Sequence, residues 1–305
     1  MNILISEVGP RDGLQSIDAI LPTSAKKTWI DAEAAAGVTE IEVGSFVPAK
    51  ILPQLADTAE LVAHARTIPG LTVAVLVPNR RGAQDAIKAG AHKITIPLSV
   101  SETHSLKNVR RSHAQMFDEV AAIAALIRDL PTDQRPVLEG GLSTAFGCTL
   151  EGRITPEQVL QAAEGLMQAG VDELGLSDTT GYADPRSVRE LTRAIWEHFG
   201  RDALTGIHLH NTRGQGLACA LAAVDIGLTT LDASLGGIGG CPFAPGASGN
   251  IVTEDLVFML EAMGLHTGID LDALLAVRRQ LREALPAEVE LYGFTADAGL
   301  PKGFR

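Results

Sequence analysis

The sequence predicts an α/β protein with a single (β/α)8 (TIM) barrel. Three observations predict it: eight strand-like runs, a glycine that ends the helical segment before every second run, and no Pro/Ser-rich linker that would divide the chain. The chain has 305 residues, which suits one such barrel. Short β-branched apolar runs alternate with longer helical patterns. The runs cover residues 3–8, 39–46, 72–77, 93–98, 136–142, 171–176, 204–210 and 229–235.

Helix boundaries can also be read from the sequence. Four Ala-rich helical segments end on a glycine that directly precedes the second, fourth, sixth and eighth runs: Gly37, Gly90, Gly170 and Gly227. Glycine fits the left-handed position just past a helix end. Thr155 and Asp184 each precede a proline and are expected helix N-caps. The chain therefore repeats one β-α unit.

The domain boundaries follow from this repeat. We expect one domain over residues 1–305, with the barrel core in about 1–264 and an extension in about 265–305. The stretch "IDLDALLAVRRQLREAL" predicts an additional C-terminal helix, followed by a tail that covers the barrel or joins an oligomer interface. The main alternative fold, a doubly wound open sheet, lacks its G-x-G-x-x-G motif after the first run.

Composition excludes several classes of function. The net charge of -12 and the pI near 5.1 argue against a nucleic-acid surface, which needs clustered Lys and Arg. Three widely spaced cysteines indicate a reducing compartment. The N-terminal sequence resembles no targeting leader, and no apolar run is long enough to cross a membrane. We therefore expect a cytoplasmic protein without nucleic-acid or membrane partners.

Polar residues mark the carboxyl ends of the predicted strands, where a barrel of this class carries its active site. They are Arg11, Asp12 and Gln15 after the first strand, Glu42 near the end of the second, Asn79 after the third, Ser143 and Thr144 at the fifth, Asp178 at the sixth, His208 and His210 on the seventh, and Cys241, Ser248 and Asn250 after the eighth.

His208 and His210 are the most informative pair. Residues i and i+2 of a strand share a face, so both imidazoles point to the barrel axis while Ile207 and Leu209 pack outward. For one histidine, a hydrogen-bonded core residue is the usual interpretation. Two on one face at the catalytic end favour a metal site instead.

Barrel closure predicts the remaining ligands. It places the eighth strand beside the first, so Asp12 and a residue after the eighth strand can join the histidines. The cysteines are not clustered, which disfavours structural zinc. Imidazole, carboxylate and amide ligands suit six-coordinate Mg²⁺ or Mn²⁺, with zinc as an alternative. Arg11 is either the ion-pair partner of Asp12 or a stabiliser of a developing oxyanion.

The three cysteines receive different interpretations. Cys241 lies in a glycine-rich stretch that suits a loop closing over the site, and its thiol is either reactive or passive. Cys219 is expected to be a small core residue. The sequence does not decide the role of Cys148.

Together these motifs resemble the hydroxymethylglutaryl-CoA lyase family over nearly the whole chain. The segments "EVGPRDGLQ", "FGCTLEG", "LSDTTG", "HLHNTRGQGLA" and "GGIGGCPFAPGASGNIVTEDLVFMLE" occur in the expected order. The resemblance implies a divalent cation held by Asp12, His208, His210 and Asn250. It implies catalytic roles for Arg11, Glu42, Asp178, His208 and Cys241, and substrate contacts for Arg11, Gln15 and Ser143.

The implied activity is that of a carbon-carbon lyase. It cleaves the C2–C3 bond of a 3-hydroxyacyl-CoA to acetyl-CoA and a keto acid, which for 3-hydroxy-3-methylglutaryl-CoA (HMG-CoA) is acetoacetate, as in leucine degradation and ketone-body formation. The sequence does not decide whether His208 or a carboxylate is the base. A homo-oligomer, dimer or larger, is expected.

Two alternatives remain. Asn211 and Arg213 depart from the family pattern, so the acyl group is open. A condensing acyltransferase of the isopropylmalate or homocitrate synthase type is the other alternative, although those enzymes carry Glu where Leu14 stands.

Overall fold

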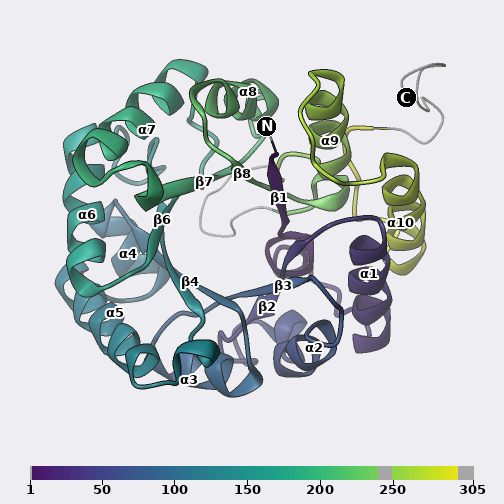
Figure 1. Cartoon of the computed structure of the whole chain (residues 1–305), viewed down its shortest axis with the longest axis horizontal. Helices are drawn as coiled ribbons and strands as arrows, with labels where there is room; N and C mark the ends of the chain where they lie inside the picture. Colours follow the sequence, from purple (N-terminus) through teal and green to yellow (C-terminus); the bar gives the residue numbers. More distant parts are fainter. Residues whose placement is uncertain (1, 240–248, 295–305) are drawn as a thin grey trace.

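The chain folds into a closed barrel of parallel strands (Figure 1). The computed structural model describes residues 2–239 and 249–294. Within them the strands pair in chain order, and β1 closes the barrel against β8. The strands are β1 (Leu4–Glu7), β2 (Glu40–Ser45), β3 (Thr72–Leu76), β4 (Lys93–Ser99), β5 (Val137–Ser143), β6 (Glu173–Asp178), β7 (Leu204–Leu209) and β8 (Thr230–Ala233). The predicted fold class is confirmed, and each predicted run overlaps one strand.

The helices form a ring outside the strands (Figure 1). They are α1 (Thr23–Ala35), α2 (Thr58–Ala65), α3 (Arg80–Ala89), α4 (Glu102–Asn108), α5 (His113–Arg128), α6 (Pro156–Ala169), α7 (Pro185–Phe199), α8 (Gly216–Ile226), α9 (Thr253–Ala262) and α10 (Leu271–Ala284). The predicted C-terminal helix is α10, which packs beside α1 and α9. Among the described helices, none has the length and apolar character needed to cross a membrane.

The predicted helix boundaries are largely confirmed. Gly90, Gly170 and Gly227 are left-handed C-caps. The Thr155 side chain accepts a hydrogen bond from the backbone N–H of Gln158. The boundary of β6 was wrong by two residues, because Val171 still bonds back to α6 and the strand begins only at Glu173.

The inner and outer faces of the strands differ in polarity. Along β5, Leu138 and Leu142 face the helices and are fully buried. Glu139, Gly141 and Ser143 alternate with them, face the barrel interior and retain partial exposure. The apolar core therefore lies between the strands and the helix ring, and the inside of the barrel has a polar lining.

One lysine holds several carboxylates at the amino ends of the strands. Lys93 Nζ lies 2.5 Å from a carboxylate oxygen of Glu139, 2.8 Å from one of Glu173 and 3.9 Å from one of Glu40. Burial raises the pKa of Glu139 to about 7, although the charge of Lys93 acts in the opposite direction. This cluster lies at the opposite end of the barrel from the predicted active site.

The Glu139 carboxyl should make stability depend on pH. Its pKa is above the ordinary value of 4.5 only in the folded chain, so the free energy of unfolding should fall as pH rises from 5 to 8. In Glu139→Gln this fall should be smaller by about 2 kcal/mol. Urea unfolding at the two pH values measures it. Glu60→Gln, at a more exposed ion pair with Lys27, is the matched control and should behave as wild type. An unchanged pH dependence in Glu139→Gln contradicts the prediction.

Candidate metal centre

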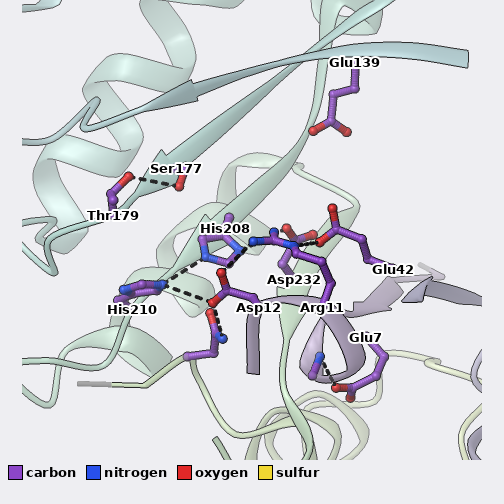
Figure 2. A network of polar contacts seen from close by, with 12 residues as sticks. Glu7, Arg11, Asp12, Glu42, Glu139, Ser177, Thr179, His208, His210 and Asp232 are labelled. Carbon is purple, nitrogen blue, oxygen red and sulfur yellow. Dashed lines mark hydrogen bonds and ion pairs between the residues drawn. The ribbon is translucent and has the colours of Figure 1, made fainter. Parts of the chain in front are cut away.

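A tight turn after β1 carries Arg11 and Asp12. The turn is π-helical over Gly9–Gly13, and its first residue has no room for a side chain. A Cβ at Gly9 would lie 2.6 Å from a Glu7 carboxylate oxygen and 2.8 Å from the Trp29 ring. The Glu7 carboxylate accepts a hydrogen bond from the Gly9 N–H at 2.8 Å. This packing fixes the turn over the carboxyl end of the barrel, where Asp12 faces β7 (Figure 2).

Glu7 also anchors the chain that follows β8. Its carboxylate accepts hydrogen bonds from the Leu235 N–H at 2.9 Å and from the Thr253 hydroxyl at 2.6 Å. Burial raises its pKa to about 8, against these hydrogen bonds. One buried side chain therefore joins the Asp12 turn to the segments on both sides of Asn250.

The two histidines of the seventh strand lie on one face, as predicted. Their Nε2 atoms are 3.0 Å apart, and His210 Nε2 is 3.8 Å from Asp12 Oδ2 (Figure 2). Ile207 and Leu209 are buried on the opposite face. One candidate ligand atom from each of Asp12, His208 and His210 lies within 4.8 Å of the others.

Asn250 completes this group. A β-bridge to His210 brings it to the barrel mouth. Its Nδ2 donates to Asp12 Oδ2 at 2.8 Å and to the carbonyl of Ile238 at 3.1 Å. Its Oδ1 is buried and has no hydrogen-bond partner among the described residues. The amide oxygen is therefore available as a ligand.

The protonation states fit a cation. Burial and the neighbouring His208 lower the pKa of His210 to about 4, so its ring is neutral. Burial opposes ionisation of Asp12, but Arg11 and the two histidines outweigh it and lower its pKa. Burial alone would lower the pKa of His208, but the hydrogen bond to Asp232 and its charge outweigh burial and raise this pKa, so binding of an ion has to compete with a proton at His208. Two imidazole nitrogens, a carboxylate and an amide oxygen match the ligands of a divalent ion that accepts nitrogen and oxygen.

Asp232 is a residue of this centre that sequence reasoning missed. Its Oδ2 lies 3.1 Å from His208 Nδ1, and the register of β7 and β8 pairs the two residues directly. A hydrogen on Nδ1 that faces this carboxylate leaves the Nε2 lone pair of His208 pointing to His210 and Asp12. The sequence feature that could have identified Asp232 is an acidic residue within an apolar strand, at a position whose side chain faces the barrel interior.

Replacing Asp232 should weaken ion binding. In Asp232→Asn the strong acceptor for the His208 ring is lost, so the affinity for Mn²⁺ should fall by roughly 10- to 100-fold. Isothermal titration with Mn²⁺ measures this directly. Asp225→Asn, at a surface ion pair of α8 with Arg189, is the control and should bind Mn²⁺ as wild type does. Equal affinities in both variants rule out an orienting role for Asp232.

Arg11 and Gln15 surround the Asp12 carboxylate. Arg11 binds Glu42 through Nε at 2.5 Å and Asp12 Oδ1 through Nη1 at 2.6 Å. Gln15 Nε2 donates to the same Asp12 oxygen at 2.6 Å. Burial raises the pKa of Glu42 despite the Arg11 charge. The guanidinium is thus held beside the candidate ligands by two carboxylates. Glu42 was expected near the end of the second strand, and β2 continues three residues past it to Ser45.

Other predicted rim residues have local structural contacts. Asp178 ends β6, and its two oxygens accept hydrogen bonds from the Tyr182 and Ala183 N–H groups at 2.8 and 3.1 Å. Burial raises its pKa to about 6. Asn79 is the N-cap of α3 and accepts from the Gly82 N–H, because β3 already ends at Leu76.

The remaining described rim residues and cysteines have no contact with the candidate ligands among the interactions given above. Ser143 ends β5, where its hydroxyl donates to Ser99 at 3.3 Å. Cys148 and Cys219 are buried free thiols, which confirms the expected core position of Cys219. Thr144 is buried beside Ser143. Cys241 and Ser248 lie outside the described residues.

Comparison with known proteins identifies the family. The model of the HMGL-like family matches residues 2–281. The chain belongs to the HMGL-like family. This HMGL-like chain is 37% identical over 286 residues to hydroxymethylglutaryl-CoA lyase YngG of Bacillus subtilis, with 93% of each chain covered. It is 38% identical to the mitochondrial hydroxymethylglutaryl-CoA lyase of Mus musculus, over 93% of this chain and 86% of that protein.

A solved structure of an HMGL-like relative shows the same fold. The HMG-CoA lyase of Acinetobacter baumannii, determined with coenzyme A and 3-methylmalate, is 39% identical. It superimposes with a TM-score of 0.87 over 93% of this chain and 91% of that chain.

Proposed function

We propose that this protein is a divalent-metal-dependent carbon-carbon lyase that cleaves HMG-CoA to acetyl-CoA and acetoacetate. The observation that carries the proposal is the convergence of Asp12, His208, His210 and Asn250 at the carboxyl end of the barrel, in an HMGL-like chain. Relatives named hydroxymethylglutaryl-CoA lyase support the reaction, and a relative solved with coenzyme A supports an acyl-CoA substrate.

The four converging residues are those that would hold the ion. Bound Mg²⁺ or Mn²⁺ would supply Lewis acidity to the substrate hydroxyl and carbonyl oxygens. Arg11 supplies a fixed positive charge next to this point. A guanidinium has five N–H donors, and Arg11 uses two of them in the contacts with Glu42 and Asp12. The others can stabilise the negative charge that develops on the thioester oxygen when the C2–C3 bond breaks.

Several groups are candidates for moving the hydroxyl proton. The pKa of Asp178, raised to about 6 by burial, lies near the range in which a carboxyl both accepts and returns a proton at neutral pH. Glu42 and His208 are the other candidates on the described side of the site. The role of Cys241, which lies outside the described residues, stays a prediction. Gln15 and Ser143 are proposed to contact the substrate.

One assay tests the lyase proposal. Purified protein is incubated with HMG-CoA and Mg²⁺ or Mn²⁺, and both acetyl-CoA and acetoacetate are measured. Cleavage should require the ion and should stop with chelator. A panel of other 3-hydroxy-3-methylacyl-CoA thioesters tests the alternative acyl groups. Release of free CoA from acetyl-CoA and a 2-oxo acid would instead indicate a condensing acyltransferase. No cleavage of any thioester by metal-loaded protein refutes the lyase proposal.

Three finer points belong to the same proposal. Mg²⁺ or Mn²⁺ is proposed as the physiological ion because the ligand set combines nitrogen with oxygen. A role in leucine degradation and ketone-body formation is proposed from the reaction. A cytoplasmic location is proposed because the three cysteines are few and widely spaced in the sequence. A homo-oligomer is proposed as the working form, and sedimentation velocity measures its size.

A further inference from the structure

The turn after β6 is built around the buried carboxylate of Asp178. It covers residues 178–183 and is called the Asp178 turn below. The N–H groups of Tyr182 and Ala183 donate to the two carboxylate oxygens at 2.8 and 3.1 Å. The Gly181 N–H donates to the Asp178 carbonyl at 3.1 Å. The position of this carboxyl therefore depends on the shape of a short turn.

Arg213, in the loop after β7, contacts this turn at three consecutive residues. Its Nη1 donates to the carbonyls of Thr180 and Gly181 at 3.0 and 2.8 Å. Its Cζ lies 4.2 Å from the centre of the Tyr182 ring, which places the guanidinium over the ring. The attraction between a guanidinium and an aromatic face adds to the two hydrogen bonds. One side chain thus holds the turn through its backbone and through an aromatic side chain.

The turn also packs closely against the loops on both sides of it. Gly181 has a φ of +66°, and a Cβ there would lie 2.5 Å from the Cβ of Thr212. Only glycine adopts this left-handed conformation freely and leaves room for the loop after β7. A Cβ at Gly147 would lie 3.0 Å from Cδ2 of Tyr182, and the Thr180 hydroxyl donates to the Gly147 carbonyl at 2.9 Å. The Asp178 turn is therefore packed between the loops after β5 and β7.

The loop that carries Arg213 is itself tied to the metal centre. Asn211 directly follows His210, and its N–H donates to the Gly249 carbonyl at 3.1 Å. Its side-chain oxygen accepts a hydrogen bond at 2.9 Å from the first N–H group of α8. Arg213 therefore extends from a fixed loop and joins the Asp178 turn to the part of the chain that carries the candidate ligands.

We propose that Arg213, stacked on Tyr182, is a positioning residue for the Asp178 carboxyl. The inference rests on the proposed function, in which Asp178 is a candidate for moving the hydroxyl proton. A proton moves between groups at hydrogen-bond distance, and a displacement of about 1 Å can cost about 100-fold in rate. Arg213 therefore acts on the rate through the turn and leaves the binding of the ion to its own ligands.

Kinetics with HMG-CoA separate this role from substrate binding. Arg213→Met should lower kcat roughly 10- to 100-fold with a smaller change in KM, and its affinity for Mn²⁺ should stay close to that of wild type. Arg213→Lys keeps a positive charge over the ring and should retain more of kcat. Tyr182→Phe keeps the aromatic face and should retain more of kcat than Tyr182→Leu.

A double variant tests whether Arg213 acts through Asp178. Asp178→Asn removes the group that accepts a proton and should by itself lower kcat. Adding Arg213→Met to Asp178→Asn should lower kcat no further, because residues that act as one unit have effects that are not additive. Losses that multiply in the double variant would give Arg213 a separate role and would overturn the inference.

Hydrogen exchange reports on the turn without any reaction. In metal-loaded Arg213→Met, the amide hydrogens of Tyr182 and Ala183 should exchange about tenfold faster than in wild type, while those of the barrel strands exchange as before. Arg201→Met is the matched control. Arg201 also stacks on an aromatic ring, that of Trp196 at 4.4 Å, but it precedes β7 at the amino end of the barrel. The control should change neither the exchange of these two amides nor kcat.

Three further results overturn the inference: wild-type exchange of both amides in Arg213→Met, wild-type kcat in that variant, or a loss of Mn²⁺ affinity as large as the loss of kcat. The lyase proposal fails separately, when metal-loaded wild type cleaves no thioester although the exchange of the two amides depends on Arg213.

Discussion

Replacing Asp12 with asparagine should lower the rate of acetyl-CoA formation from HMG-CoA about a thousandfold. The amide keeps the size of the side chain but removes the charge that faces His210 and Arg11. The affinity for Mn²⁺ should fall in parallel, because an amide oxygen is a weaker ligand than a carboxylate. Steady-state kinetics at saturating Mn²⁺ and calorimetry with Mn²⁺ measure the two effects.

The control for this variant is a surface aspartate. Asp85 forms an exposed ion pair with Arg81 on α3, and Asp85→Asn should retain wild-type rate and ion affinity. Wild-type Mn²⁺ affinity in Asp12→Asn would remove Asp12 from the ligand set, whatever the effect on rate.

Arg11→Met should lower kcat by roughly 10²- to 10³-fold with a smaller change in KM. The variant removes the positive charge proposed to stabilise the thioester oxygen as the carbon-carbon bond breaks. The ion ligands remain, so Mn²⁺ affinity should change much less than in Asp12→Asn. Comparing kcat with Mn²⁺ affinity in both variants separates stabilisation of the reacting oxygen from ion binding.

Two further variants control for damage to the site. Arg11→Met leaves the buried Glu42 carboxylate without its partner, which destabilises the fold by itself. The double variant Arg11→Met with Glu42→Gln removes that unpaired charge, so it should be more stable than Arg11→Met while its kcat stays at least as low. Arg11→Lys keeps the charge without the planar fork and should retain part of kcat. Recovery of wild-type kcat in the double variant refutes the role of Arg11.

The architecture could be predicted from the sequence because each strand of a barrel can be recognised from a short stretch of residues. Each strand is a short apolar run that is followed by polar residues, and every second strand is preceded by a glycine that ends a helix. These features lie within a few residues of one another in the sequence. The two histidines were predictable because strand alternation alone fixes their common face. Asp12 was predictable because closure of a barrel always places the last strand beside the first. The β6 boundary was wrong because Val171 is as apolar as a strand residue.

Contacts that depend on strand register or on the packing of a helix against a strand could not be predicted from the sequence. Asp232 faces His208 only because of the register between β7 and β8, and register is not visible in either strand alone. The hydroxyl of Ser99 meets His104 because α4 folds back over the end of β4. Asn79 looked like a rim residue, yet its side chain satisfies a backbone N–H of the next helix.

The bonds of Glu7 have a consequence for how the protein is made. This carboxylate joins the Gly9 turn to Leu235 and Thr253, so the two parts of the metal centre come from opposite ends of the chain. A ribosome adding about 5–20 residues per second needs roughly 10–50 s after the turn to reach Thr253. Throughout that interval the nascent chain carries Asp12 without Asn250. With the proposed ligand set, tight ion binding therefore requires a chain whose barrel has closed, and we expect it late in biosynthesis.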